Sequence, residues 1–537
     1  MVVPGGYPVV VAIARLAAAL LILNASLTFQ SLWPTPAVRW KGELSIELGV
    51  ALLLLALATL RGTPLTSRRA VRWMAMVWLV LVIGRYADVT AQALYGRDIN
   101  LYWDLRFIPD VASMLARATP WWLIAGAAVG TALVLALLYV VIRWSIREVA
   151  AAFEWPTARR VMLAGGAVLV VLFAIEAPRQ LDAHERWFPT PITTTYFRQV
   201  RLAADAMGGG RSVPASPLMS SNFSRVQGAD VILLFLESYG AVTFDRPEFA
   251  KGLEPARRTL DEAVRATDRS SVSAFVESPT FGGESWLAHI TLMSGVEVRD
   301  PHTNAVLMTQ HRETIANAFS RHGYRTLANM PGLWWDWPEG SFYGFDDIYG
   351  ALRLDYRGPQ FGWFTLTDQF ALARIDAFEI AKQLRPPLFI FFPTVSTHAP
   401  FTPTPPYQPD WGRMLDQRPY DRADLDASYN DVANWMDLGP GYVKAVDYAL
   451  RTVAGYLRLR AGRDLVLIVI GDHQPAAAVS GERAPWDVPV HVIASRPELL
   501  AHLRSSGFAD GLTPRRPILG KMHELLPVLL KAFGEPE

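Results

Sequence analysis

Three apolar runs in the C-terminal part of the chain lead into side chains of the kinds that bind metal ions. The side chains are Glu237, His398, Asp472 and His473. Glu, Asp and His together suit a divalent cation such as zinc, manganese or magnesium. Each residue alone has a simpler explanation, because a carboxylate after a strand is commonly a helix cap and a lone histidine is commonly structural. Their coincidence predicts one divalent metal ion, with a second ion as an open alternative.

A candidate nucleophile lies in a segment that begins with two glycines. Gly282 and Gly283 let the backbone approach a ligand closely, and the apolar pattern after them predicts a helix that ends at Gly295. Ser285 then lies at the N-terminus of this helix, where free N–H groups and the helix dipole favour an alkoxide and a bound phosphate. A coordinated metal would lower the hydroxyl pKa further. The alternative is that Ser285 is simply the helix N-cap.

The elements that must position these residues are short strands that alternate with helices. Strands are expected at Val231–Leu236, Val272–Val276, Arg325–Met330, Leu388–Phe392, Leu465–Ile470 and Val488–Ile493. Helices are expected at Arg312–His322, Thr367–Leu384 and Tyr442–Leu459. This rhythm of nearly all-apolar strands predicts an α/β domain with a largely parallel sheet covered by helices on both faces. Sites in such a sheet form beyond the carboxyl ends of its strands, which is where the candidate ligands lie.

The composition of the 537-residue chain places part of it in a bilayer. Hydrophobic residues make up 51% and charged residues only 19%, which is too apolar for an ordinary soluble enzyme. Apolar runs that fit membrane spans occur at about Tyr7–Trp33, Leu44–Leu60, Trp73–Tyr86, Pro120–Ile142 and Val161–Ile175. We therefore expect an N-terminal multi-span helical membrane domain of about five spans over residues 1–178. A linker over residues 179–228 and a compact domain over residues 229–537 would follow.

Basic residues in the short loops predict the orientation of the chain. Eight arginines flank the even-numbered spans on one side: Arg61, Arg68, Arg69, Arg72, Arg143, Arg147, Arg159 and Arg160. Under the positive-inside rule these segments are cytoplasmic, so everything after Ile175 lies outside. We expect a multi-pass protein of the inner (cytoplasmic) membrane whose compact domain is periplasmic or extracellular.

Charge and cysteine content exclude several classes of function. The 51 Lys and Arg residues balance 50 Asp and Glu residues to a net charge of +1, which gives no field to attract nucleic acid. The chain has no cysteine, so disulfides, thiolate metal sites, cysteine nucleophiles and an oxidised-cysteine sulfatase centre are excluded.

The order of these motifs resembles a known family. Membrane spans are followed by Leu-Glu-Ser at Glu237, a Gly-Gly-x-Ser helix start, Thr-His at His398 and Gly-Asp-His at Asp472. This looks like the membrane-anchored sulfatase-like transferases of the alkaline phosphatase superfamily, whose nearest members are lipoteichoic acid synthases, periplasmic-glucan phosphoglycerol transferases and phosphoethanolamine transferases. The resemblance implies an alkaline-phosphatase-like fold, and metal ligands at Glu237, Ser285, Asp472 and His473. It also implies that Ser285 is the nucleophile and that His398 contacts the phosphoryl group or the leaving oxygen.

The chain departs from this family at several positions. These transferases generally use Thr where this chain has Ser285, and the phosphoethanolamine branch usually carries several disulfides, which this chain lacks. Phosphoglycerol is therefore favoured over phosphoethanolamine. Asp336 stands where the lipoteichoic acid synthases have Arg. The adjacent Trp334 and Trp335 are candidates to stack on a sugar, with core packing or interfacial anchoring as the alternative.

The resemblance implies transfer of a phospholipid headgroup to an extracytoplasmic glycan or lipid acceptor, through a covalent intermediate on Ser285. Two alternatives remain open at this point. Water could replace the acceptor, which gives a sulfatase-like hydrolase of phosphate or sulfate esters. The domain could also be a non-catalytic membrane sensor or scaffold, although an intact set of Glu, Ser, Asp and His residues argues against it.

Overall fold

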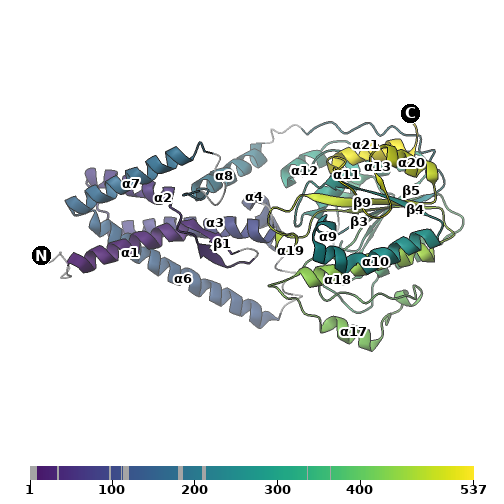
Figure 1. Ribbon diagram of the computed structural model, residues 1–537, viewed down its shortest axis with the longest axis horizontal. Helices are drawn as coiled ribbons and strands as arrows, with labels where there is room; N and C mark the ends of the chain where they lie inside the picture. Colours follow the sequence, from purple (N-terminus) through teal and green to yellow (C-terminus); the bar gives the residue numbers. More distant parts are fainter. Residues whose placement is uncertain are drawn as a thin grey trace. The chain divides into compact units, whose positions relative to one another are not determined.

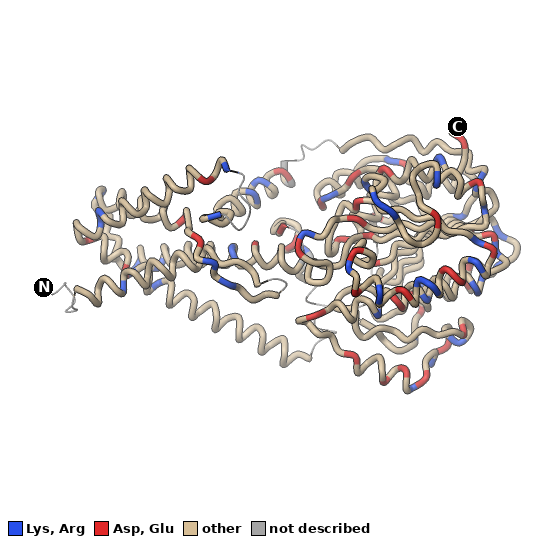
Figure 2. Tube along the Cα trace, viewed as in Figure 1, with Lys and Arg blue, Asp and Glu red and all other residues tan. Residues whose placement is uncertain are grey.

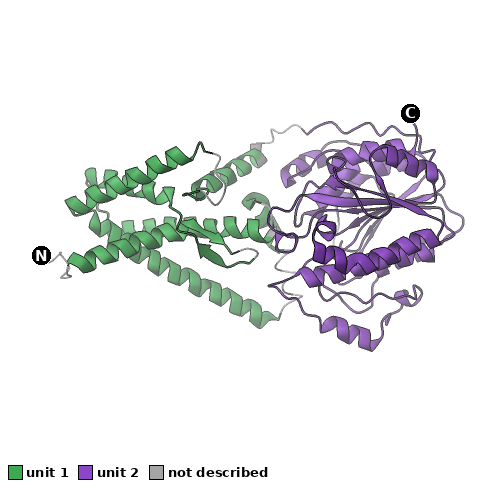
Figure 3. Cartoon of the chain, in the orientation of Figure 1, with its two compact units in different colours: residues 1–94, 98–208 green, residues 95–97, 209–537 purple. Residues whose placement is uncertain are grey.

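The computed structural model describes residues 9–32, 35–95, 98–109, 112, 116, 120–179, 186–208, 213–334, 337–362 and 364–536. The chain forms two compact units (Figures 1 and 3). One takes in residues 1–94 and 98–208, and the other takes in residues 95–97 and 209–537. Charged residues are sparse along the long helices of the first unit and frequent in the second, for example along its helix α10 (Pro247–Ala266) (Figure 2).

The first unit is built from apolar helices. They are α1 (Val9–Thr28), α2 (Ile46–Leu60), α3 (Arg68–Tyr95), α6 (Trp121–Ala152) and α7 (Pro156–Glu176). Each of the five predicted apolar runs therefore overlaps one of these helices, although the end of the first run, Phe29–Ser31, forms a strand. Within the described residues, four of these helices are long and apolar enough to cross a membrane, whereas α2, with 15 residues, is shorter than a full span. The unit also contains the hairpin strands β1 (Phe29–Ser31) and β2 (Val38–Trp40), helix α4 (Leu101–Asp104) and the turn η1 (Leu105–Phe107).

The segment that we predict to be a linker contains a helix. Helix α8 (Ile192–Gly208) clusters with the first unit, and the compact second unit takes up the chain again at residue 209. Its side chains bond to first-unit helices: the Tyr196 hydroxyl donates to Val80 O at 2.6 Å, and Thr195 Oγ1 donates to Asp88 Oδ1 at 3.2 Å. The prolines and glycines around α8 suggested a linker, and these long-range bonds are not visible in local composition.

An eight-stranded sheet forms the centre of the second unit. Its order is β10-β4-β9-β8-β3-β7-β5-β6. The strands are β3 (Asp230–Leu236), β4 (Ser270–Glu277), β5 (Arg325–Met330), β6 (Asp347–Gly350), β7 (Leu388–Pro393), β8 (Leu465–Gly471), β9 (Asp487–Ala494) and β10 (Ala509–Asp510). From β8 to β6 every neighbouring pair is parallel, whereas β9 runs antiparallel to both β8 and β4, and β10 antiparallel to β4. The largely parallel sheet is confirmed. The two short strands β6 and β10 carry no apolar run that would have predicted them.

Helices cover both faces of this sheet, as predicted (Figure 1). Alternate residues of β3 enter different cores: Val231, Leu233 and Phe235 pack with α11, α13, α20 and α21. The intervening Ile232 and Leu234 pack with α10, α16 and α18 on the other face. The helices of the unit are α9 (Val242–Asp245), α10 (Pro247–Ala266), α11 (Ser285–Ser294), α12 (Pro301–Met308), α13 (Ile315–Arg321), α14 (Gly340–Tyr343), α15 (Ala351–Leu354), α16 (Asp368–Ile375), α17 (Arg422–Tyr429), α18 (Gly439–Leu459), α19 (Ala477–Ser480), α20 (Pro497–Ser505) and α21 (Met522–Phe533).

Two of the three predicted helices of this unit are shorter than expected. Helix α13 begins only after Thr314, whose side chain forms a capping box with Asn317. Helix α16 ends at Ile375 and continues as a single π-helical turn (Asp376–Ile380), so the regular α-helix does not extend to Leu384. Helix α18 extends over the third predicted segment.

Candidate metal centre and active site

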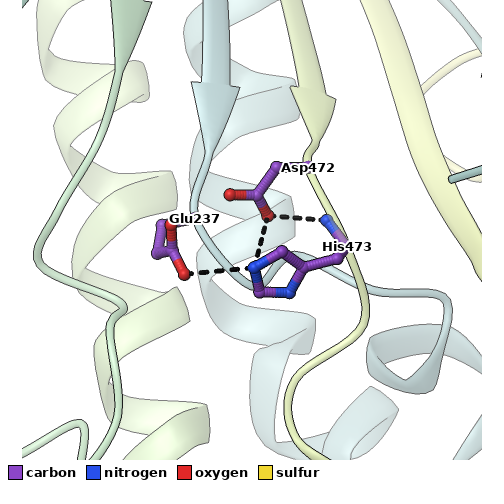
Figure 4. Close-up of side chains that lie close together, drawn as sticks. All are labelled: Glu237, Asp472 and His473. Carbon is purple, nitrogen blue, oxygen red and sulfur yellow. Dashed lines mark hydrogen bonds and ion pairs between the residues drawn. The ribbon is translucent and has the colours of Figure 1, made fainter. Parts of the chain in front are cut away.

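Two neighbouring parallel strands bring the candidate ligands together. The register pairs Leu236 of β3 with Gly471 of β8, so the residues that follow, Glu237 and Asp472, emerge side by side at the carboxyl edge of the sheet. One ligand atom from each of Glu237, Asp472 and His473 lies within 4.8 Å of the others (Figure 4). His473 Nε2 is 3.4 Å from Glu237 Oε1 and 3.8 Å from Asp472 Oδ1. All three side chains are buried.

Ser285 completes this cluster from helix α11. Its hydroxyl donates to Glu237 Oε2 at 2.8 Å and lies 3.1 Å from His473 Nε2. The helix ends at Gly295 as predicted, but its N-cap is Glu284, held at φ 60° and ψ 41° in the left-handed region. Ser285 is the first helical residue, so the alternative that it is the N-cap is wrong. Ser285 is half-buried, whereas Glu237, Asp472 and His473 are buried.

Backbone carbonyls fix the orientation of the His473 imidazole. Its Nδ1 lies 2.7 Å from Gln474 O, an arrangement in which Nδ1 donates and Nε2 faces Ser285. The same carbonyl accepts the Gly282 N–H at 3.1 Å. The Gln474 carbonyl therefore holds both the glycine turn before Ser285 and the His473 imidazole.

Two threonines after β7 hold the Glu237 backbone, and we did not predict them. Thr394 Oγ1 accepts the Glu237 N–H at 3.0 Å, and Thr397 Oγ1 donates to Glu237 O at 2.5 Å. Ser238 adds two further bonds: its hydroxyl donates to Glu237 Oε1 at 3.1 Å, and its N–H donates to Asp472 Oδ1 at 2.8 Å. Ser238 itself has a positive φ of 57°, a conformation that non-glycine residues adopt at a cost. The only sequence signal for these contacts is the position of the threonines just beyond a strand end.

Burial and mutual charge govern the protonation of the cluster. Burial raises the pKa of Asp472 well above its usual value, and the Glu237 carboxylate raises it further. Burial opposes ionisation of Glu237 as well, but the charge and hydrogen bond of His473 outweigh it and hold the pKa of Glu237 low. Burial alone would lower the pKa of His473, whereas Asp472 and Glu237 raise it to about 9. The imidazolium is thus the positive charge that balances the buried Glu237 carboxylate, while burial and Glu237 both oppose ionisation of Asp472.

His398 lies at the rim of the site rather than within the cluster. Its Nδ1 lies 2.8 Å from Ala399 O, and its ring packs edge-on against Phe364 at 5.3 Å between centroids. It lines a small cavity together with Phe361 and Phe401. Its charge contributes to the low pKa of Glu237, so it is within electrostatic reach of the cluster.

The loop that carries His398 is held by a buried carboxylate that we did not predict. Asp368 Oδ1 accepts the Val395 N–H at 2.7 Å, and its Oδ2 accepts the Ser396 N–H at 3.0 Å. Burial raises the pKa of Asp368 to about 6, and its hydrogen bonds only partly offset this. Asp368 is also the first residue of α16, where the sequence indicated only a helix start.

Of the two tryptophan candidates for sugar stacking, the structure describes only Trp334. Trp334 is partly buried and packs against the core on the α10, α16 and α18 face, which agrees with the core alternative. Trp335 lies outside the described residues, as does Asp336. Trp337 packs on Tyr343 with 5.0 Å between ring centroids.

Part of the C-terminal unit matches a known protein family. Residues 288–489 match the sulfatase family model. This match lies within the C-terminal unit. The predicted sulfatase-like character is confirmed, and the matched range includes His398, Asp472 and His473 but begins just after Ser285. No curated protein sequence matches the chain at a significant level.

Several solved structures resemble the chain at low sequence identity. The lipoteichoic acid synthase LtaP from Listeria monocytogenes is 15% identical over 62% of this chain and 78% of its own, with a TM-score of 0.39. The lipooligosaccharide phosphoethanolamine transferase EptA from Neisseria meningitidis is 12% identical over 97% of this chain and 95% of its own, with a TM-score of 0.49. The phosphoglycerol transferase GacH from Streptococcus pyogenes is 12% identical over 63% and 80%, with a TM-score of 0.34. These TM-scores and identities are too low to assign a function to this chain.

Proposed function

We propose that this protein is a metal-dependent transferase that moves the headgroup of a phospholipid to an extracytoplasmic glycan or lipid acceptor. One observation carries the proposal: the hydroxyl of the half-buried Ser285 lies at the start of α11, within hydrogen-bond distance of both Glu237 and His473. A hydroxyl placed next to a buried base at a helix N-terminus is suited to nucleophilic attack on phosphorus. The apolar helices of the first unit would hold the site at a membrane, where the donor lies.

The four clustered side chains fit a divalent cation. Two carboxylates, an imidazole with its Nε2 directed at the cluster and a hydroxyl supply oxygen and nitrogen donors suited to zinc or manganese. Glu237, Ser285, Asp472 and His473 would hold the ion. When bound, it would offset negative charge on the phosphoryl oxygens and lower the pKa of the serine hydroxyl.

The residues of the chain then account for two displacement steps. Ser285 Oγ attacks the phosphorus of the donor, and its proton passes toward Glu237 Oε2, the atom that already accepts it. The bond from phosphorus to diacylglycerol breaks, and the diacylglycerol oxygen takes a proton, for which His398 at the rim is the proposed donor. The headgroup is left on Ser285 as a phosphodiester. The hydroxyl of the acceptor attacks this phosphorus in turn and gives its proton to His398. The bond from phosphorus to Ser285 Oγ then breaks, and Oγ takes back the proton held at Glu237, which regenerates Ser285.

Among donors, we favour a phosphoglycerol headgroup over phosphoethanolamine. The support is the absence of cysteine, because the phosphoethanolamine branch of the resembling family usually carries disulfides. A hydrolase of phosphate or sulfate esters is the second candidate, since water can enter by the same half-buried face of Ser285. The first unit favours the transferase, because four potential membrane spans tie the site to lipid donors.

The test is headgroup transfer by the full chain reconstituted in lipid. Phosphatidylglycerol and phosphatidylethanolamine carrying isotope-labelled headgroups are supplied with a cell-envelope glycan fraction, and lipid and glycan products are followed by mass spectrometry. Ser285→Ala should abolish diacylglycerol release, and Ser285→Thr should retain part of it because the hydroxyl is restored. Ser294→Ala, at the other end of α11, is the matched control and should remain active, since its hydroxyl bonds only to backbone groups away from the cluster, donating to Ile290 O and accepting the Val296 N–H. Release of free labelled headgroup with no labelled glycan would refute the transferase and support the hydrolase.

A further inference from the structure

Three large apolar side chains of the second unit are exposed in one loop. Val432 is 82% exposed, Trp435 is 69% exposed and Met436 is 71% exposed. All three lie in residues 430–438, which join α17 to α18 and are called the Trp435 loop below. Exposed apolar side chains gathered in one place mark a surface that meets a protein or a membrane.

The Trp435 loop is folded by its own polar contacts, so these side chains are displayed by an ordered turn. Asn434 Oδ1 accepts the Met436 N–H at 3.1 Å, and Asn434 O accepts the Asp437 N–H at 2.9 Å. Asp431 forms an ion pair with Lys444 of α18, with 2.7 Å between Oδ2 and Nζ. Asn434 and Asp431 thus bond within the second unit, whereas Val432, Trp435 and Met436 are exposed.

Both ends of the Trp435 loop are anchored to the surroundings of the active site. At its C-terminal end, the Tyr442 hydroxyl donates to Ser238 O at 2.7 Å, next to Glu237. At its N-terminal end, Tyr429 stacks on Phe361 with 5.5 Å between centroids, and Phe361 lines the same cavity as His398. The loop and the site therefore belong to the same edge of the sheet.

We propose that the Trp435 loop inserts into the lipid leaflet that the C-terminal unit faces. Tryptophan prefers the interface between headgroups and acyl chains, and methionine and valine favour the apolar side of it. The partner is a zwitterionic lipid surface. Residues 421–438 contain five acidic residues, and the three cations paired with them, Arg413, Arg422 and Lys444, leave a net negative charge that anionic lipid would repel. Insertion brings the site to the depth of the headgroups, and this consequence, unlike the insertion itself, rests on the proposed function.

The absence of cysteine makes the insertion directly measurable in the full chain. A single cysteine is introduced as Trp435→Cys, labelled with the environment-sensitive fluorophore NBD, and the protein is reconstituted in phosphatidylcholine bilayers with or without lipids that carry a doxyl quencher on the acyl chain. Leu384→Cys is the matched control: Leu384 is also apolar and fully exposed, but precedes β7 and so lies at the opposite edge of the sheet. We expect blue-shifted, quenched emission from position 435 and unshifted, unquenched emission from position 384.

Equal quenching at the two positions, or none at position 435, would overturn the insertion. A label shielded in native envelopes but not in pure phosphatidylcholine would also overturn it, because the loop would then bind a protein. Replacing a third of the phosphatidylcholine with phosphatidylglycerol should weaken the quenching, and strengthening would refute the charge argument.

A second arm separates this inference from the proposed function. The triple variant Val432→Ser, Trp435→Ser, Met436→Ser should lose turnover of bilayer lipid while keeping turnover of a short-chain, water-soluble donor. If neither donor is turned over by the unaltered chain, the transferase is refuted and the quenching result still stands. If the triple variant turns over bilayer lipid as the unaltered chain does, the loop has no part in reaching the donor.

Discussion

Metal binding by the cluster should release a proton and should therefore strengthen with pH. In the metal-free protein Asp472 and Glu237 raise the pKa of His473 to about 9, so at pH 7 the imidazole is protonated and must lose its proton before Nε2 can act as a ligand. A pKa two units above the working pH corresponds to about 2.7 kcal/mol, because each unit is worth about 1.36 kcal/mol. From the His473 proton alone, affinity for Mn²⁺ should thus rise about tenfold per pH unit between pH 6 and 8 and about fivefold from pH 8 to 9, or about fiftyfold between pH 7 and 9.

Isothermal titration of the full chain with Mn²⁺ measures this directly. Repeating the titration in buffers of different ionisation enthalpy counts the protons released, and we expect at least about one per ion at pH 7. Asp472→Asn, which removes one ligand and one source of the raised pKa, should lose high-affinity binding. An affinity that stays constant between pH 7 and 9, with no proton released, would show that His473 is not a ligand and would refute the metal centre described above.

Three further outcomes follow from the contacts around the site. Thr397→Val removes the donor to the buried Glu237 carbonyl and should lower the free energy of unfolding by about 1–3 kcal/mol, whereas Thr397→Ser keeps the donor and should not. Chemical denaturation of the detergent-solubilised chain tests this. An equal loss of stability in both variants would refute it. Burial raises the pKa of Asp368 in the folded protein from its usual 3.8 to about 6. Its contribution to stability is therefore full below about pH 4 and is lost as pH rises through about 6, by at most about 3 kcal/mol. Asp368→Asn should flatten this part of the stability profile, and an unchanged profile would refute the assignment. A reporter that is active only in the cytoplasm, fused after Glu537, should be silent, and an active fusion would reverse the predicted orientation.

Most strands of the second unit could be predicted because a buried strand has an apolar local sequence. The six apolar runs from Val231 to Ile493 all became strands, since a strand covered by helices on both faces must be apolar along its length. Strands β6 and β10 could not be found in this way, because they lie toward the edges of the sheet and have four and two residues. The helix α8 was missed for a related reason: what stabilises it is contact with distant helices rather than its own sequence.

The candidate site was predictable as a set of residue types but not as a network. Strand ends indicated Glu237, Asp472 and His473, and the sheet register then placed them together. The supporting bonds from Thr397 and Asp368 depend on how a loop folds back after β7, and no local pattern encodes that fold. Ser285 shows the limit most clearly, since sequence spacing left open whether it is the helix N-cap, whereas the backbone conformation places the N-cap at Glu284. Its role as the nucleophile stays a prediction.

The central claim is that Ser285 carries the headgroup during turnover. The full chain, reconstituted with phosphatidylglycerol and Mn²⁺ in the absence of acceptor, is quenched with acid and measured by intact-protein mass spectrometry. We predict a mass increase equal to one glycerol phosphate less water, placed on Ser285 by peptide fragmentation, chased away by added acceptor and absent from Ser285→Ala. A Ser285→Ala chain that still forms the adduct, or that releases diacylglycerol at the rate of the unaltered chain, would contradict the account.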